Sequence, residues 1–135
     1  MRINVETVVK GTLARVWQAY TTPADIVQWN AASDDWHTTK SEVDLRVGGA
    51  FSSRMEAKDG SMGFDFAGTY TQVVPQSRIA YRFGVRTAEI TFTPVAGGIR
   101  VQVDFDGEET HPVEMQRQGW QAILDNFARH VESGH

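Results

Sequence analysis

Hydrophobic and polar residues alternate through most of the middle of the chain, from residue 51 to residue 105. Such alternation predicts strands with one buried face and one solvated face. Turn residues separate the alternating stretches, namely Asp59-Gly60, Pro75-Gln76-Ser77 and Ala96-Gly97-Gly98, and they are typical of hairpins and short loops. Because short connections join consecutive strands, the pattern predicts an antiparallel meander.

The first 40 residues predict a strand followed by two short helices. Alternation indicates a strand over residues 3–10, after which Thr12 is a favourable cap for a first helix. Thr22 is expected to cap a second helix that ends near Trp29. Residues 30–40 show no clear period, so they are predicted to form a loop.

The last segment predicts one long helix. Thr110 or His111 is expected to cap it, with Pro112 in its first turn and Gly134 just past its end. At 1.5 Å per residue, a helix of about 20 residues spans roughly 30 Å, which is long enough to cross a sheet. Its apolar residues share one face: Val113, Trp120, Ile123, Leu124, Phe127 and Val131.

The predicted inner face of the sheet is rich in aromatic residues. A flat sheet under one helix could not bury all of them, so we expect the sheet to curl around the last helix. Gly48-Gly49 and Gly68 are expected to form bulges or bends that allow the curl. The predicted fold is therefore α+β, a single domain over residues 1–135 in which a curved antiparallel sheet of six or seven strands grips a long C-terminal helix. The inward aromatic residues are Phe51, Phe64, Phe66, Tyr70, Tyr81, Phe83, Phe92 and Phe105.

Composition and charge exclude several classes of protein. The chain has no cysteine, which excludes disulfides, thiolate metal sites and cysteine nucleophiles. Its net charge is −4 and it has no basic block that could follow a phosphate backbone, so nucleic acid is not expected as a partner. No apolar run approaches the ~20 residues of a membrane-spanning helix, and the first residues lack the apolar core of a signal peptide. We therefore expect a cytoplasmic protein without membrane insertion.

Motifs for metal binding or nucleophilic catalysis are not found in the sequence. The four histidines show neither His-x-x-x-His nor His-Glu-x-x-His spacing, and there is no Gly-x-Ser-x-Gly elbow. Gly48-Gly49 is not followed by a turn into a helix, so it is interpreted as a backbone feature rather than a phosphate cradle. No metal, cofactor or catalytic residue is predicted.

A series of short motifs, in order along nearly the whole chain, carries a family resemblance. They are Val16-Trp17, Trp29, Asp44-Leu45-Arg46-Val47-Gly48-Gly49-Ala50-Phe51, Gly68-Thr69-Tyr70, and Gly119-Trp120 with Leu124, Asn126-Phe127 and His130. Together they resemble the activator of heat shock protein 90 ATPase homologue-like family of the START/SRPBCC superfamily, whose helix-grip fold is shared with the birch-pollen allergen. The resemblance implies a β-α-α-β-β-β-β-β-β-α order and a cavity that often holds apolar small molecules. It implies no particular reaction, because relatives include binders, lipid carriers, cyclases and chaperone partners.

These expectations favour noncatalytic binding of a small hydrophobic or amphipathic molecule in a cavity between the sheet and the last helix. We expect Trp36 and His37 to guard the opening. The predicted walls are Phe51, Met55, Phe66, Tyr81, Phe92, Trp120, Ile123 and Phe127.

Two other functions are left open by the sequence. One is a cyclase- or hydrolase-like enzyme in which His37 or Tyr81 acts as the acid or base. The other is a protein-interaction module, either a stress-response or chaperone-linked partner or a homodimer, which would expose an apolar patch.

Overall fold

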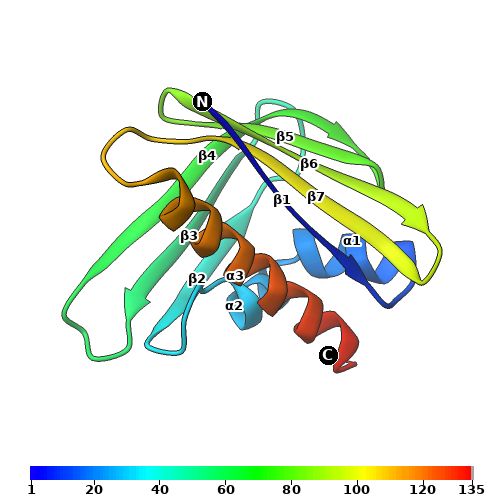
Figure 1. The fold of residues 1–135 in the computed structure, drawn as a ribbon, viewed down its shortest axis with the longest axis horizontal. Helices are drawn as coiled ribbons and strands as arrows, with labels where there is room; N and C mark the ends of the chain where they lie inside the picture. Colours follow the sequence, from blue (N-terminus) through cyan, green and yellow to red (C-terminus); the bar gives the residue numbers. More distant parts are fainter. Residues whose placement is uncertain (135) are drawn as a thin grey trace.

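The structure, a computed structural model, describes residues 1–134 and follows the predicted order of strands and helices (Figure 1). None of the three helices in this range has the length and apolar composition to span a bilayer. The elements in chain order are β1 Arg2–Val9, α1 Leu13–Thr21, α2 Pro23–Trp29, β2 Trp36–Val43, β3 Ala50–Ala57, β4 Gly63–Val74, β5 Arg78–Phe83, β6 Arg86–Val95, β7 Gly98–Asp106 and α3 Val113–Glu132.

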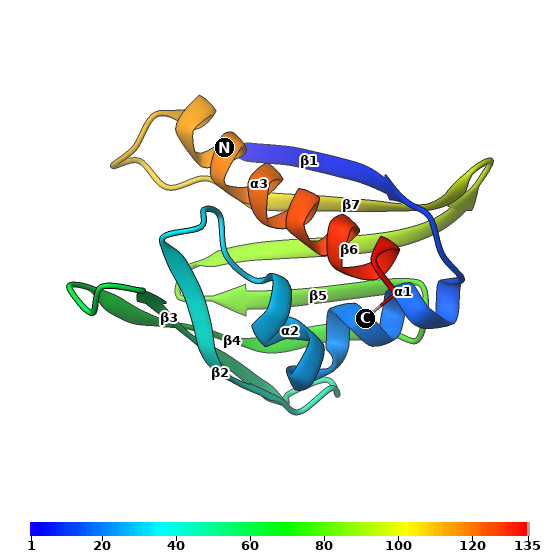
Figure 2. The same ribbon diagram turned by 90° about the horizontal axis from the view of Figure 1, so that it is seen from below.

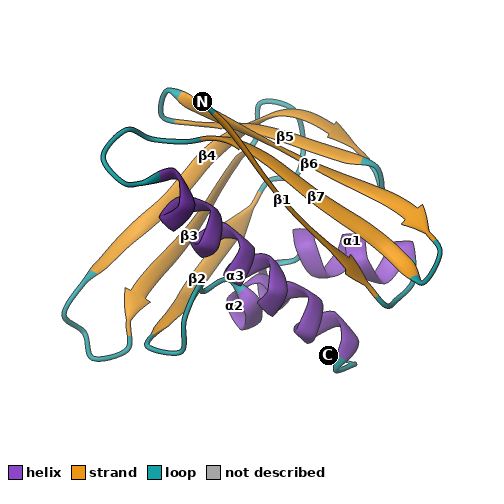
Figure 3. Cartoon of the chain, in the orientation of Figure 1, coloured by secondary structure: helices purple, strands orange, loops and turns teal. Residues whose placement is uncertain are grey.

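The seven strands form one antiparallel sheet in the order β1-β7-β6-β5-β4-β3-β2. The sheet is strongly curled, and α3 crosses its concave side with α1 and α2 nearby (Figures 2 and 3). Because only the concave face is covered, strand residues alternate between buried and more accessible positions, most regularly in β7, where buried and partly buried residues alternate. The predicted α+β helix-grip fold is confirmed.

The predicted loop over residues 30–40 is wrong from Trp36 onward, where β2 begins. Trp36 pairs with Ala57 and Val43 pairs with Phe51, although the ladder is interrupted between Thr38 and Lys40. The segment is largely polar and carries this bulge, so its alternation is weak in the sequence. Pairing with β3 makes it a strand, as tertiary context often does for residues of modest β-propensity.

The Asp44–Gly49 segment forms the tight turn between β2 and β3. The Asp44 carboxylate accepts hydrogen bonds from Arg46 Nε at 3.0 Å, and the Gly49 N–H donates to the Arg46 carbonyl at 2.8 Å. Gly48 has a φ of +84°, and a Cβ on Gly49 would collide with the Asp44 carbonyl. The turn then bonds to β4, because the Gly48 N–H donates to the Tyr70 carbonyl at 2.8 Å and the Tyr70 N–H donates to the Gly49 carbonyl at 2.9 Å. This motif therefore fixes the position of Tyr70 on the concave face.

Gly68 creates room for an aromatic ring in the sheet. A Cβ at this position would lie 2.8 Å from the Phe51 ring and 2.5 Å from the Arg82 carbonyl oxygen. The irregularity in the β4–β5 ladder lies slightly later than predicted, between Tyr70 and Gln72. Gly68 thus lets the Phe51 ring approach the backbone of β4 closely, while the bulge after Tyr70 contributes to the bend.

The predicted helix caps are confirmed only in part, since Thr22 occupies the N-cap position of α2 but makes no side-chain hydrogen bond there. Thr12 caps α1, since its hydroxyl oxygen accepts from the Arg15 N–H at 3.2 Å. At α3 the N-cap is Pro112, which has no side-chain hydrogen bond, rather than Thr110 or His111. The Gln116 side chain instead reaches back from the first turn, donating to the Glu108 carbonyl at 2.9 Å and accepting from the Glu108 N–H at 2.8 Å. This amide anchors the loop that a capping side chain would otherwise hold.

A cluster of three polar side chains joins the three helices. Asp25 in α2 accepts from Arg15 Nη2 of α1 at 2.9 Å, and its Oδ1 lies 2.8 Å from His130 Nε2 of α3. The side chains of Asp25 and His130 are only 13% and 7% exposed. Burial raises the pKa of Asp25, but the hydrogen bonds and charges of Arg15 and His130 outweigh it, so that the pKa is lowered. The ionised carboxylate is therefore the form that the fold stabilises.

We expect Asp25→Asn to lower the free energy of unfolding by about 2 kcal/mol at pH 7, because it removes the charge from a mostly buried, hydrogen-bonded cluster. A lowered pKa means that the stabilisation is present above the ordinary pKa of Asp, about 4, and is lost as the pH falls through the folded value. Urea unfolding at pH 7 and pH 3 should show a difference between wild type and variant that shrinks in acid. Glu42→Gln is the control, since Glu42 pairs with Lys40 where both side chains are well exposed and should change stability by less than about 0.5 kcal/mol. Equal effects of the two substitutions at pH 7 would contradict a stabilising role for the cluster.

Candidate functional site

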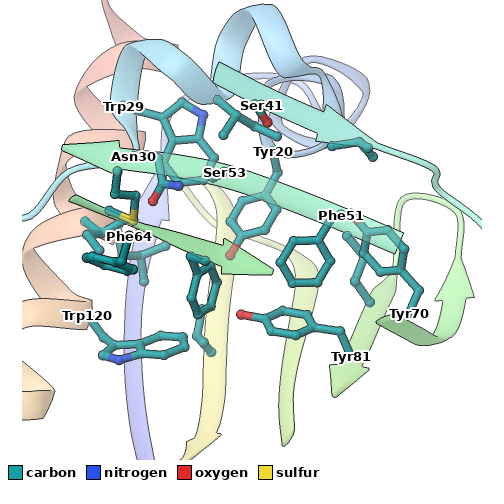
Figure 4. A pocket seen from close by; sticks show the side chains of 18 of the residues that line it. Tyr20, Trp29, Asn30, Ser41, Phe51, Ser53, Phe64, Tyr70, Tyr81 and Trp120 are labelled. Atoms are coloured by element: carbon teal, nitrogen blue, oxygen red, sulfur yellow. The ribbon is translucent and has the colours of Figure 1, made fainter. Parts of the chain in front are cut away.

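A pocket of about 320 Å³ lies between the concave face of the sheet and the helices (Figure 4). Its floor comes from the strands β2 to β7, and its cover comes from α1, α2 and α3. Most of its lining is apolar or aromatic, as is typical of small-molecule sites. The lining residues outside the predicted set include Tyr20, Ile26, Trp29, Asn30, Ser41, Val43, Ser53, Phe64, Tyr70 and Arg86.

Aromatic rings form a continuous wall on the sheet side. Phe51 packs edge-on against Tyr81, with ring centres 4.7 Å apart, and tilts against Phe66 at 5.9 Å. From the helix side, Trp120 meets Phe66 at 6.2 Å and stacks on Phe105 at 3.9 Å. Because each ring is supported by another ring, the wall is set by packing and has little freedom to collapse inward.

Three tyrosines bring hydroxyl groups into this apolar space. The hydroxyl oxygens of Tyr20 and Tyr81 face each other across the pocket (Figure 4). Within residues 1–134 the hydroxyls of Tyr20, Tyr70 and Tyr81 form no hydrogen bond. Burial raises the pKa of all three, to about 12 for Tyr70, where the Asp44 charge adds to the effect. They remain neutral hydrogen-bond donors across the physiological pH range.

A pair of serines adds further polar groups to the lining. Ser41 of β2 and Ser53 of β3 are direct cross-strand partners, and Ser53 is only 5% exposed. The Ser41 hydroxyl oxygen is buried and has no hydrogen-bond partner within the described part of the chain. Thr38, on the same strand, differs because its hydroxyl donates to the Asn30 carbonyl at 2.6 Å. An unsatisfied buried hydroxyl is costly, so the Ser41 side chain lowers the stability of this part of the interior.

Six of the ten predicted site residues lie together at this pocket: Phe51, Met55, Phe66, Tyr81, Trp120 and Ile123. Phe92 and Phe127 do not line it, which differs from the prediction. Both are almost fully buried, and Tyr20 lies edge-on over each of them, with ring centres at 5.6 Å and 5.1 Å. The first helix, whose inward face the prediction did not assign to the pocket, places Tyr20 between these rings and the cavity.

Trp36 and His37 also do not line the pocket, in contrast to their predicted place at its opening. They border a separate, more polar depression together with Lys58 and Arg129. The reason is that they begin β2, where pairing with β3 holds them, instead of lying in the predicted loop. Trp36 packs against one residue of the pocket lining, because its ring centre lies 5.9 Å from that of the half-exposed Phe64.

The residues that the sequence reasoning missed come mainly from the helices and from β2. Tyr20 and Trp29 are not among the predicted pocket walls, and Ser41 lies in a segment with weak hydrophobic alternation. Arg86 had a detectable signal, since it lies an even number of residues before Ala88 and Ile90, both fully buried on the inner face. Continuing the alternation from Ile90 and Ala88 to the start of β6 places Arg86 on the same concave face.

Among residues 1–134, no group of three or more histidine, aspartate or glutamate side chains is placed to hold a metal ion. The charged side chain of the pocket lining is Arg86. The site as described therefore offers apolar surface, neutral hydroxyl donors and one guanidinium group.

Comparison with known proteins supports the architecture and its lineage. The family model of the Activator of Hsp90 ATPase homolog 1-like protein matches residues 10–132. The solution structure of an AHSA1-like protein from Aeromonas hydrophila is 47% identical, with a TM-score of 0.93 over 98% of this chain and 93% of that one. A Cytophaga hutchinsonii protein is 42% identical, with a TM-score of 0.84 over 98% and 92% of the two chains. A Chromobacterium violaceum protein is 28% identical, with a TM-score of 0.85 over 97% and 96%. No curated protein matches the sequence.

Ser41→Ala should leave the free energy of unfolding unchanged or raise it by up to about 1 kcal/mol, because it removes a buried hydroxyl that has no partner. Thr38→Val is the matched substitution on the same strand, and it should lower stability by about 1–2 kcal/mol because the Asn30 carbonyl loses its donor. Urea unfolding of the unliganded protein measures both. A comparable loss in the two variants would show that the Ser41 hydroxyl is engaged in the folded protein.

Proposed function

Because the chain belongs to the Activator of Hsp90 ATPase homolog 1-like family and has its helix-grip fold, we propose that it binds a small amphipathic molecule in the pocket between sheet and helices. The observation that carries this proposal is the combination of an aromatic wall with hydroxyl groups that have no partner within residues 1–134. The hydroxyls of Tyr20, Tyr70 and Tyr81 belong to side chains that line the pocket, so they can donate hydrogen bonds to a molecule bound there.

The size and composition of the pocket fit a small ligand. Its volume of about 320 Å³ lies at the lower end of the roughly 300–1,000 Å³ range of ligand pockets. Burying apolar ligand surface contributes about 25 cal/mol per Å², from which the cost of association must be subtracted. Affinities in the micromolar range are therefore expected.

The chemistry of the lining favours binding over acid–base catalysis. Its ionisable side chains are Tyr20, Tyr70, Tyr81 and Arg86, and the described lining includes no histidine or carboxylate. Burial moves the pKa values of the tyrosines away from neutral pH, where a general acid or base works best. His37, the other acid–base candidate, borders the separate depression.

We expect Phe66→Leu to weaken binding of the fluorescent probe N-phenylnaphthylamine about tenfold, because Phe66 supplies part of the wall that meets both Tyr81 and Trp120. Phe92→Leu is the matched control. It makes the same substitution at a more deeply buried ring outside the lining, so it should lower stability more and binding less. Probe fluorescence titrations and thermal unfolding measure the two quantities separately.

Wild-type protein that does not bind the probe at micromolar concentration would contradict the proposed function. Equal loss of affinity in the two variants would show that the probe responds to general destabilisation rather than to the pocket wall.

A further inference from the structure

We propose that the ligand of this pocket is an organic carboxylic acid, whose charged end binds Arg86 while its apolar part lies against the aromatic wall. This inference rests on the proposed function and specifies the chemical class of the ligand. It follows from the placement of Arg86, from its lack of a counter-charge and from the donor beside it.

Arg86 lies at the start of β6, directly opposite Phe83 across the β5–β6 hairpin. It shares the inward face of the strand with Ala88 and Ile90, which are fully buried. Its guanidinium carbon lies 4.5 Å from the centre of the Phe83 ring, an arrangement that holds a cation against an aromatic face. A permanently charged group is thus positioned on the concave side of the sheet, where it lines the pocket.

Arg86 has no carboxylate partner within residues 1–134. Within the described residues its side chain makes one long hydrogen bond, of 3.4 Å, from Nη1 to the Asp106 carbonyl. The carboxylate of Asp106 is already occupied, because it accepts from Arg2 Nη1 at 3.0 Å and from the Thr87 N–H at 2.8 Å. The half-buried guanidinium is therefore undersatisfied, in a protein where seven other arginines pair with acidic residues: Arg2, Arg15, Arg46, Arg54, Arg78, Arg100 and Arg117.

Tyr81 provides a second donor close to this cation. Tyr81 lies two residues before Phe83 on β5, so both side chains are on the inward face of that strand. It lines the pocket, and its hydroxyl is directed inward (Figure 4). The positive charge of Arg86 is near enough to oppose the rise in the pKa of Tyr81 that burial causes. A carboxylate accepts several hydrogen bonds, and the guanidinium fork matches its geometry. Arg86 and Tyr81 together therefore suit an anionic oxygen pair better than a neutral polar group.

The test compares naphthylacetic acid with naphthylacetamide, which share one aromatic frame and differ in charge at neutral pH. Each compound is used to displace N-phenylnaphthylamine from the wild-type protein, and the affinities are checked by calorimetry. We expect the acid to bind about 10- to 100-fold more tightly than the amide, as for a charge-assisted hydrogen bond in a partly buried site. In Arg86→Gln this advantage should disappear, while the affinity for the amide changes by less than about twofold.

Arg82→Gln is the matched control, because Arg82 also lacks an ion pair but is exposed on the convex face of β5. It removes the same charge and should leave the preference for the acid intact. Arg86→Lys keeps the charge without the planar fork, so it should retain part of the preference for the acid. If Arg86→Gln folds poorly, a reduced preference in Arg86→Lys tests the same role.

The possible outcomes separate the two proposals. If the acid and the amide bind wild type equally, or if Arg82→Gln removes the preference as fully as Arg86→Gln, the role of Arg86 is overturned and pocket binding still stands. If the probe and both naphthyl compounds fail to bind wild type, the proposed function fails and the anion preference fails with it.

Discussion

The structure depends on the packing of large aromatic rings between a strongly curved sheet and a single helix. A curved sheet of seven strands presents more inward surface than one helix can cover, so rings from β3, β4 and β5 must contact one another as well as α3. Close packing is achieved around Phe105 of β7 and Phe127 of α3, which are fully buried. In the centre the rings meet edge to face and leave space, which is the pocket.

The polar groups of this interior are arranged in a way that packing alone does not require. Thr38 satisfies its hydroxyl with the Asn30 carbonyl, which is the usual solution for a buried polar side chain. Ser41, Tyr20 and Tyr81 do not, and Arg86 lies on the same concave surface without an acidic partner within the described residues. These four side chains are spread over α1, β2, β5 and β6, and all four line the pocket in which we propose that a ligand binds.

Much of the fold could be predicted from the sequence because its signals are local. Alternation in β7, the cap at Thr12 and the Gly48-Gly49 turn each follow from a few neighbouring residues. The site was only partly predictable, because its wall on the sheet side follows from alternation but its cover depends on how helices dock. Tyr20 separates Phe92 and Phe127 from the cavity, and no local pattern indicates which of these three rings faces the empty space. The strand at Trp36–Val43 was missed for a related reason, since pairing with β3 outweighs its weak periodicity.

The strand order leaves β1 and β2 as the two edges of an open sheet, and no ladder joins them. The gap between these edges is spanned by α3, which packs along β1, and by α2, which packs along β2. The contacts of Asp25 with Arg15 and His130 hold those helices together. The open side of the curled sheet is therefore closed by side-chain contacts between helices and not by backbone pairing of strands. Opening the seam between α2 and α3 would separate this cluster, the ring contact of Trp29 with Phe127 and the hydrogen bond from Asn126 to the Ala31 carbonyl, but it would break no strand ladder.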